Sequence, residues 1–135
     1  TPPVVTPNWD SQKALTALEI DRVPFEHING NCQGYATANK VAVNPVAAYP
    51  EKTLFHELAH VVLGHTKESL MSDSEQNIKE VQAESVAYIL CSILGVGNLD
   101  TCAGYIQSWL KGEGVSNKDA QQIFSAANKI LKAGQ

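Results

Sequence analysis

Cysteine, long apolar runs and positive charge are all scarce in this chain, and each scarcity excludes a class of protein. The three cysteines, an odd number without close spacing, make a poor disulfide framework and favour a reduced, intracellular setting. No stretch is long and apolar enough to cross a bilayer, and no secretory pattern opens the chain. A net charge of −4 argues against binding of a nucleic-acid backbone, which usually needs a basic face. We therefore expect a cytoplasmic domain without membrane or direct nucleic-acid contacts.

The length of 135 residues and the 44% hydrophobic content suit one compact domain with a single core. Residues 1–7 are rich in proline and look like the remnant of a linker, so residues 8–135 are expected to form the domain. The missing initial Met points to processing or to a fragment of a longer product. Cys91 lies in an apolar run, where buried packing is its expected role, although a bridge to Cys102 stays open.

The order of patterns along the chain predicts an α+β fold, in which an N-terminal helix and a small antiparallel sheet precede a helical half. Asn8 or Asp10 can cap the first helix, and Pro24 ends it. Strand-like segments follow at 24–28, 33–37 and 41–44. Helices are then expected at 50–64, from a capping box at 72–75 to Leu94, from Asp100 or Thr101 to Gly112, and from Ser116 onward. The last of these should bury one apolar stripe, formed by Ala120, Ile123, Phe124, Ala127, Ile130 and Leu131.

The chemistry centres on the segment His56-Glu57-Leu58-Ala59-His60. On a helix, His56 and His60 are four residues apart and project from the same face, so that both can bind one Zn²⁺ through nitrogen. Glu57 points near the metal without reaching it, where it can take a proton from a water molecule. A chance occurrence of the pattern is the weaker interpretation, because the chain has only four histidines. An apolar face opposite the histidines indicates a partly buried helix: Leu54, Leu58, Val61 and Val62.

A catalytic zinc keeps three protein ligands, and the third is predicted on the next helix. Glu80 and Glu84 are four residues apart on one face, and Ala83 and Ala87 on the same stripe let this helix pack closely against the histidine helix. Two carboxylates on such a face are costly to bury unless they are paired. We expect Glu80 to be the ligand and Glu84 to accept a hydrogen bond from a ligand histidine. The reverse assignment, or a solvated surface role for either carboxylate, stays open.

Three other residues have weaker claims on the site. His65 follows His60 by five residues and lies off the ligand face, so it is not expected to bind the metal. Tyr105 can reach the site and stabilise an oxyanion, although packing of Tyr105 and Trp109 in the core is the favoured interpretation. His27, near a strand, is expected to be a surface or structural histidine.

The His-Glu-x-x-His motif with a glutamate on a later helix resembles the gluzincin pattern, and Glu84 one turn after Glu80 resembles the thermolysin-type arrangement of a ligand and an acid behind it. A closer resemblance covers nearly the whole chain. It is carried by Gln33-Gly34-Tyr35-Ala36, Val41-Ala42-Val43-Asn44-Pro45, Lys52-Thr53-Leu54-Phe55 before the motif, Ala83-Glu84, Tyr105-Ile106-Gln107-Ser108-Trp109-Leu110 and Ile123-Phe124-Ser125-Ala126-Ala127. These segments are similar to the metallopeptidase domain of the ArdC antirestriction family, which is related to the ImmA/IrrE peptidases that cleave phage-type repressors.

This resemblance implies a bacterial, plasmid or phage origin, one Zn²⁺ per chain and a protein or peptide substrate. In ArdC proteins the domain follows a single-stranded-DNA-binding domain, so such a domain is expected upstream in a full-length protein. In zincins a strand before the metal helix pairs with an extended peptide substrate, which makes residues 34–44 a candidate substrate-binding hairpin. Plain sheet structure explains that hairpin equally well. Its candidate contact residues are Tyr35, Ala36, Val41 and Val43.

Three functions compete on this evidence. A zinc endopeptidase with Glu57 as general base ranks first, because ligands and base are all present. A non-catalytic zinc-binding interaction module in antirestriction or DNA transfer ranks second. A nucleic-acid binder ranks last because of the acidic charge balance.

Overall fold

The computed structural model describes residues 9–26, 34–47, 49–67, 73–96 and 117–135, without the side chains of 73–77 and 117. In these ranges the elements run α1 (Ser11–Leu18), β1 (Asp21–Arg22), β2 (Gly34–Thr37), β3 (Lys40–Val43), α2 (Pro50–Val62), the 3₁₀ helix η1 (His65–Lys67), α3 (Asp73–Leu94) and α5 (Asn117–Ala133). The predicted α+β class is confirmed. The predicted helix ending at Gly112 lies outside the described residues, as do Cys32, Cys102, Tyr105, Trp109 and His27.

The first helix begins as predicted but ends earlier. Asp10 caps it, because its Oδ1 accepts hydrogen bonds from the backbone N–H groups of Gln12 at 2.9 Å and Lys13 at 3.4 Å. Glu19 then adopts a left-handed conformation with φ of 58°, and its N–H bonds back to the last turn. The helix therefore stops well before Pro24, which was expected to end it.

The three strands form a mixed sheet in the order β1-β3-β2. The predicted antiparallel hairpin is present, with Ala36 opposite Val41. The first strand differs from expectation: it lies at 21–22 rather than 24–28 and runs parallel to β3, with Asp21 opposite Lys40. A physical reason is that Pro24 has no N–H to donate, whereas the N–H of Val23 still reaches the carbonyl of Val41 at 2.9 Å.

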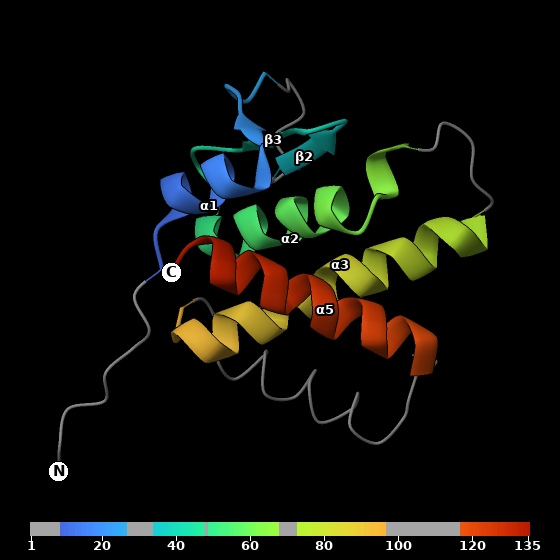
Figure 1. Ribbon diagram of the computed structural model, residues 1–135. Coiled ribbons are helices and arrows are strands. Elements are labelled where there is room, and N and C mark those ends of the chain that lie inside the picture. The colour runs from blue at the N-terminus through green and yellow to red at the C-terminus, as the bar shows by residue number, and fades with distance from the viewer. Residues whose placement is uncertain (1–8, 27–33, 48, 68–72, 97–116) are drawn as a thin grey trace, which may run out of the picture.

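Helix α2 lies in the middle of the molecule. The sheet packs on one side of it, and α3 and α5 pack on the other (Figure 1). Pro50 occupies the first turn, as expected, and the apolar face buries Leu54 and Leu58 fully or nearly so. Val61 and Val62 on the predicted face are only partly buried. The His-Glu-x-x-His motif thus lies on the helix that contacts the sheet, α3 and α5.

The two later helices complete the core. Helix α3 ends at Leu94, and Gly95 follows with a φ of 69°, as predicted for a helix-ending glycine. Cys91 is fully buried in the core, as its place in an apolar run predicted. On α5, Ile123 and Ile130 are buried as predicted, whereas Phe124 is 52% exposed and Ala126 is buried in its place. No helix of the described residues is long and apolar enough to cross a bilayer.

Candidate metal centre

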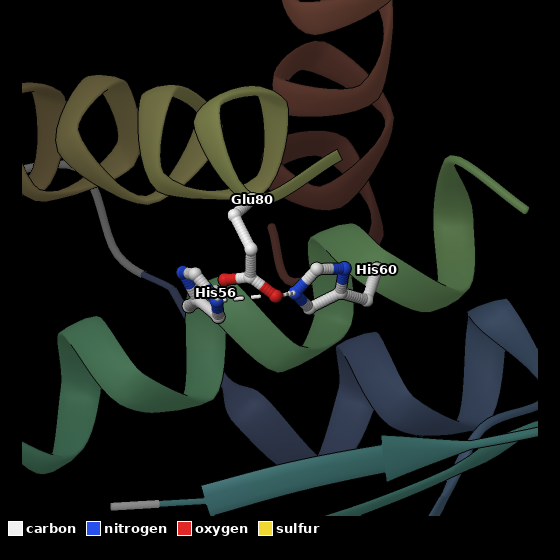
Figure 2. Close-up of side chains that lie close together, drawn as sticks. All are labelled: His56, His60 and Glu80. Carbon is white, nitrogen blue, oxygen red and sulfur yellow. Dashed lines mark hydrogen bonds and ion pairs between the residues drawn. The ribbon is translucent and has the colours of Figure 1, made fainter. Parts of the chain in front are cut away.

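Helices α2 and α3 bring two imidazoles and one carboxylate together. Glu80 of α3 reaches between the side chains of His56 and His60 on α2 (Figure 2). Its Oε2 lies 3.1 Å from His56 Nε2, and its Oε1 lies 3.2 Å from His60 Nε2. The two Nε2 atoms are 3.1 Å apart. One ligand atom from each of the three residues lies within 4.8 Å of the others, so these residues can hold one metal ion.

A second carboxylate of α3 faces the back of the first histidine. Glu84 Oε1 lies 3.7 Å from His56 Nδ1 and 3.4 Å from the ammonium of Lys52. Lys52 also donates a hydrogen bond to the Tyr88 hydroxyl at 3.1 Å and lies over its ring. Glu84 therefore stands where a carboxylate orients a ligand imidazole through its other nitrogen.

The close packing of these groups changes their protonation in the metal-free state. Burial opposes the charge on His56, but the hydrogen bond to Glu80 and the nearby carboxylate of Glu84 outweigh it and raise the pKa of His56 to about 10. The hydrogen bond from His56, together with the contact to His60, lowers the pKa of Glu80. Burial opposes ionisation of Glu84, yet the nearby imidazole of His56 and the charge of Lys52 lower the pKa of that carboxyl. A proton on His56 thus occupies the place where a metal would bind.

Glu57 lies beside this cluster in a different environment. It is only 6% exposed, and its Oε2 has no hydrogen-bond partner among the described residues. Burial raises the pKa of Glu57, while the nearby His56 and His60 act in the opposite direction. An unsatisfied buried carboxylate oxygen is costly, so it indicates a functional rather than a packing role.

An open cleft of about 440 Å³ is bordered by His56, Glu57, Glu80 and Glu84. Gly34, the first residue of β2, closes one side of it. A Cβ at this position would lie 2.7 Å from the Ala42 carbonyl, 2.8 Å from Thr53 Cγ2 and 3.4 Å from Glu57 Cγ, so only glycine lets the strand pass this close to α2. The cleft is lined by Gly34, Tyr49, Lys52, Thr53, His56, Glu57, Glu80 and Glu84.

The second histidine of the motif has a different partner behind it. His60 Nδ1 lies 2.9 Å from Nδ1 of His65, the first residue of η1. His65 Nε2 in turn lies 2.9 Å from Gln82 Oε1 of α3. Burial lowers the pKa of His65 to about 4, so this ring is neutral at physiological pH. His65 is not in the ligand cluster, in agreement with the sequence-based expectation.

The cleft is lined by four of the predicted site residues, His56, Glu57, Glu80 and Glu84, and His60 contacts Glu80. The four predicted substrate-binding residues are not among the residues that line it. Tyr35 and Ala36 lie in β2, at an edge of the described sheet. Val41 and Val43 lie in the central strand and are buried at 0% and 7% exposure, so their side chains belong to the core. The sequence did not predict the contacts made around the two histidines and Glu84 by Lys52, Tyr88, His65 and Gln82. Lys52, one turn before His56, is the one whose spacing could have revealed it.

The donor set fits zinc. Two imidazole nitrogens and one carboxylate oxygen are the ligands of a catalytic zinc site, which leaves one position open. Each imidazole has a group placed behind its other nitrogen, and Glu57 offers an unpaired oxygen beside the cluster. This arrangement of side chains on two packed helices defines a class, the metal-dependent hydrolases built on a His-Glu-x-x-His helix.

The family is shown by comparison with known proteins. A model of the zincin-like metallopeptidases, MPTase-PolyVal, matches residues 38–129, which is more than half of the chain. The chain therefore belongs to this zincin-like metallopeptidase family. No curated protein and no solved structure matches it significantly. Membership implies zinc as the metal, hydrolysis as the reaction and a protein or peptide as the substrate.

Proposed function

We propose that this protein is a zinc-dependent peptidase in which His56, His60 and Glu80 hold the metal and Glu57 is the general base. The observation that carries the proposal is the buried Glu57 Oε2, which has no hydrogen-bond partner in the described part of the chain. Glu57 lines the same cleft as two of the proposed ligands, His56 and Glu80. A carboxylate left unpaired at this place has its acceptor capacity available for a water molecule.

The roles of the residues follow from their positions. Zinc, when bound, polarises the scissile carbonyl and makes water more acidic. Glu57 takes a proton from the attacking water and passes it to the leaving amine. Its raised pKa helps both transfers, because a base works best with a pKa nearer the working pH. Glu84 holds His56 from behind, and Lys52 balances the charge of Glu84.

The edge of the sheet is the proposed place of the substrate backbone. Strand β2 is at one end of the strand order, and its first residue, Gly34, lines the cleft beside Glu57. An extended peptide that follows β2 would pass Glu57 with its scissile bond near the metal ligands. Tyr35 and Ala36 are the proposed contact residues, because Val41 and Val43 are in the core.

The biological setting is proposed on the resemblance to the ArdC and ImmA/IrrE families. It supports a protein of a bacterial mobile element or phage that acts in the cytoplasm, either on a restriction-related factor or on a repressor. The segments named above carry that resemblance. A non-catalytic zinc module in antirestriction is the competing function, and it would not need Glu57.

Substitution of Glu57 by Gln tests the mechanism. The amide keeps the shape of the side chain but cannot take a proton, so zinc-loaded Glu57→Gln should cleave a fluorogenic peptide library about 10²–10⁴-fold more slowly than wild type. Glu51→Gln, the same change at an exposed position of α2, is the matched control and should keep full activity. Zinc content should be unchanged in both. Full activity of Glu57→Gln would exclude Glu57 as the base, and an unaffected antirestriction function would favour the non-catalytic module.

A further inference from the structure

We infer that His65 and Gln82 are positioning residues that fix the tautomer of His60, so that the lone pair of His60 Nε2 faces the metal site. The inference rests on the proposed zinc site and goes beyond it, because neither residue is a ligand. Four elements contribute to the chain of contacts, which runs from Asp119 of α5 through Gln82 of α3 and His65 of η1 to His60 of α2.

The orientation of the Gln82 amide is set at the far end of this chain. Gln82 Nε2 lies 3.1 Å from Asp119 Oδ1 and 2.8 Å from Gln122 Oε1. A carboxylate only accepts hydrogen bonds, so the Gln82 atom that faces it is the NH₂ group. The amide oxygen must then point in the other direction, where it meets His65 Nε2 at 2.9 Å. Gln82 is 5% exposed, so water does not compete for its amide.

The proton positions on the two rings follow from that orientation. Because Gln82 Oε1 accepts, His65 Nε2 carries a hydrogen. His65 is 9% exposed, and its direct partners are a neutral amide and another imidazole, which do not compensate a buried charge. Nδ1 of the neutral His65 ring is therefore an acceptor. At a separation of 2.9 Å, His60 Nδ1 must be the donor, which leaves His60 Nε2 without a hydrogen.

Without the contacts behind His60, the neighbouring Glu80 would favour the opposite His60 tautomer, with the hydrogen on Nε2. Glu80 Oε1 lies 3.2 Å from His60 Nε2, where it can accept a hydrogen from that nitrogen. In the absence of His65, His60 would gain this bond by moving its hydrogen to Nε2, and metal binding would then have to displace it. The buried contacts behind His60 thus decide its tautomer before any metal arrives. His56 differs, since a carboxylate, Glu84, faces its Nδ1.

The experiment compares His65→Leu with His65→Asn. Asparagine places an amide oxygen where the Nδ1 of the ring lies and can still accept from His60, whereas leucine cannot. Long-range ¹H–¹⁵N NMR on metal-free, histidine-labelled protein reports which nitrogen of His60 carries the hydrogen. We expect Nδ1–H in wild type and His65→Asn, and Nε2–H in His65→Leu. Zinc affinity, measured by competition with a chromophoric chelator, should fall about 10–100-fold in His65→Leu and largely recover in His65→Asn.

Thr66→Val is the matched control, because Thr66 lies in the same 3₁₀ turn as His65. It removes the hydrogen bond from the Thr66 hydroxyl to the Ala38 carbonyl and leaves the contacts of His65 and Gln82 in place. This control should change neither the tautomer of His60 nor the zinc affinity. If His65→Leu does not fold, Gln82→Leu replaces it and should give a mixture of His60 tautomers. The inference is wrong if His65→Leu, or Gln82→Leu in its place, keeps His60 entirely in the Nδ1–H form, or if His65→Asn binds zinc as weakly as His65→Leu. A wild type that binds no zinc contradicts the proposed function instead, while the NMR comparison still decides the tautomer.

Discussion

At the scale of single residues, Glu80 and Glu84 lie one turn apart on α3 but have different neighbours. Glu80 touches the Nε2 atoms of both histidines, whereas Glu84 faces only the Nδ1 of His56 and the Lys52 ammonium. Glu80→Ala should therefore lose the bound zinc. Glu84→Ala should keep one zinc per chain with affinity reduced about 10–100-fold. Elemental analysis of the wild type and both variants, purified side by side, checks this. Loss of zinc only in Glu84→Ala would move the ligand assignment by one turn.

Protonation of His56 makes zinc binding depend on pH. In the metal-free protein the pKa of His56 is about 10, so at neutral pH this ring carries a proton that zinc must displace. Because protons compete with zinc at every pH below that pKa, the apparent zinc affinity should rise with pH by about tenfold per unit between pH 6.5 and 8.5. Chelator competition across this range measures the slope. An affinity that does not change with pH would show that His56 releases no proton to the metal.

The sequence predicts these residues unequally, for a physical reason. The motif histidines and Glu57 lie on one turn of one helix, and helical periodicity alone places them together. His65 and Gln82 act only because η1, α3 and α5 meet behind His60. No spacing along the chain encodes that meeting, so the sequence predicted that His65 is not a ligand but gave no role for it. Glu80 and Glu84 fall between these cases, since the sequence predicted their shared face and favoured Glu80 as the ligand but left the reverse assignment open.

At the scale of elements, close contact between α2 and α3 sets the ligand distances. Ala83 on α3 is fully buried in the core, one turn or less from Glu80 and Glu84, as its place among small residues predicted. Ala83→Leu should separate the helices, lower the free energy of unfolding by about 1–3 kcal/mol and weaken zinc binding. Urea unfolding and a zinc titration test both effects. Ser92→Leu, at an exposed position of α3, is the control and should leave both values near wild type. Unchanged zinc affinity in Ala83→Leu would show that the site does not depend on this packing.

The strands show where prediction of elements fails. The hairpin of β2 and β3 was predictable, because two strand-like runs flank a short turn. The strand β1 has only two residues, too few to show a period of two, and its parallel partner is fixed by backbone contacts such as Asp21 N–H to the Asn39 carbonyl. These are long-range contacts that no local pattern reports. The wrong prediction of β1 does not affect the candidate site, because β2 is the one strand of the described residues that borders the cleft.

At the scale of the whole molecule, Trp9 links the two ends of the described chain to α2, the helix that carries the histidine motif. Its indole N–H donates to the Ile130 carbonyl at 3.0 Å, and its ring meets Phe55 edge-on at 5.1 Å between centroids. Phe55 directly precedes His56 on α2 and is buried in the core, so this contact supports the helix next to the motif. The neighbouring Asp10 N–H also reaches the Gly134 carbonyl at 2.8 Å. Both ends therefore stabilise the element that carries the site.

Removal of this ring should destabilise the whole fold more than the site. Trp9→Ala loses the contacts with α2 and α5 together, and we expect the free energy of unfolding to fall by about 3 kcal/mol. Trp9→Phe keeps an aromatic ring but loses the indole hydrogen bond, so about 1 kcal/mol is expected. Excess zinc should recover part of the loss, because only the folded chain holds the metal site. Denaturant unfolding with and without zinc measures each value. Equal stability of Trp9→Ala and wild type would show that α2 is held without the chain ends, and a zinc stoichiometry below wild type in the folded variant would show that the ends act on the site itself.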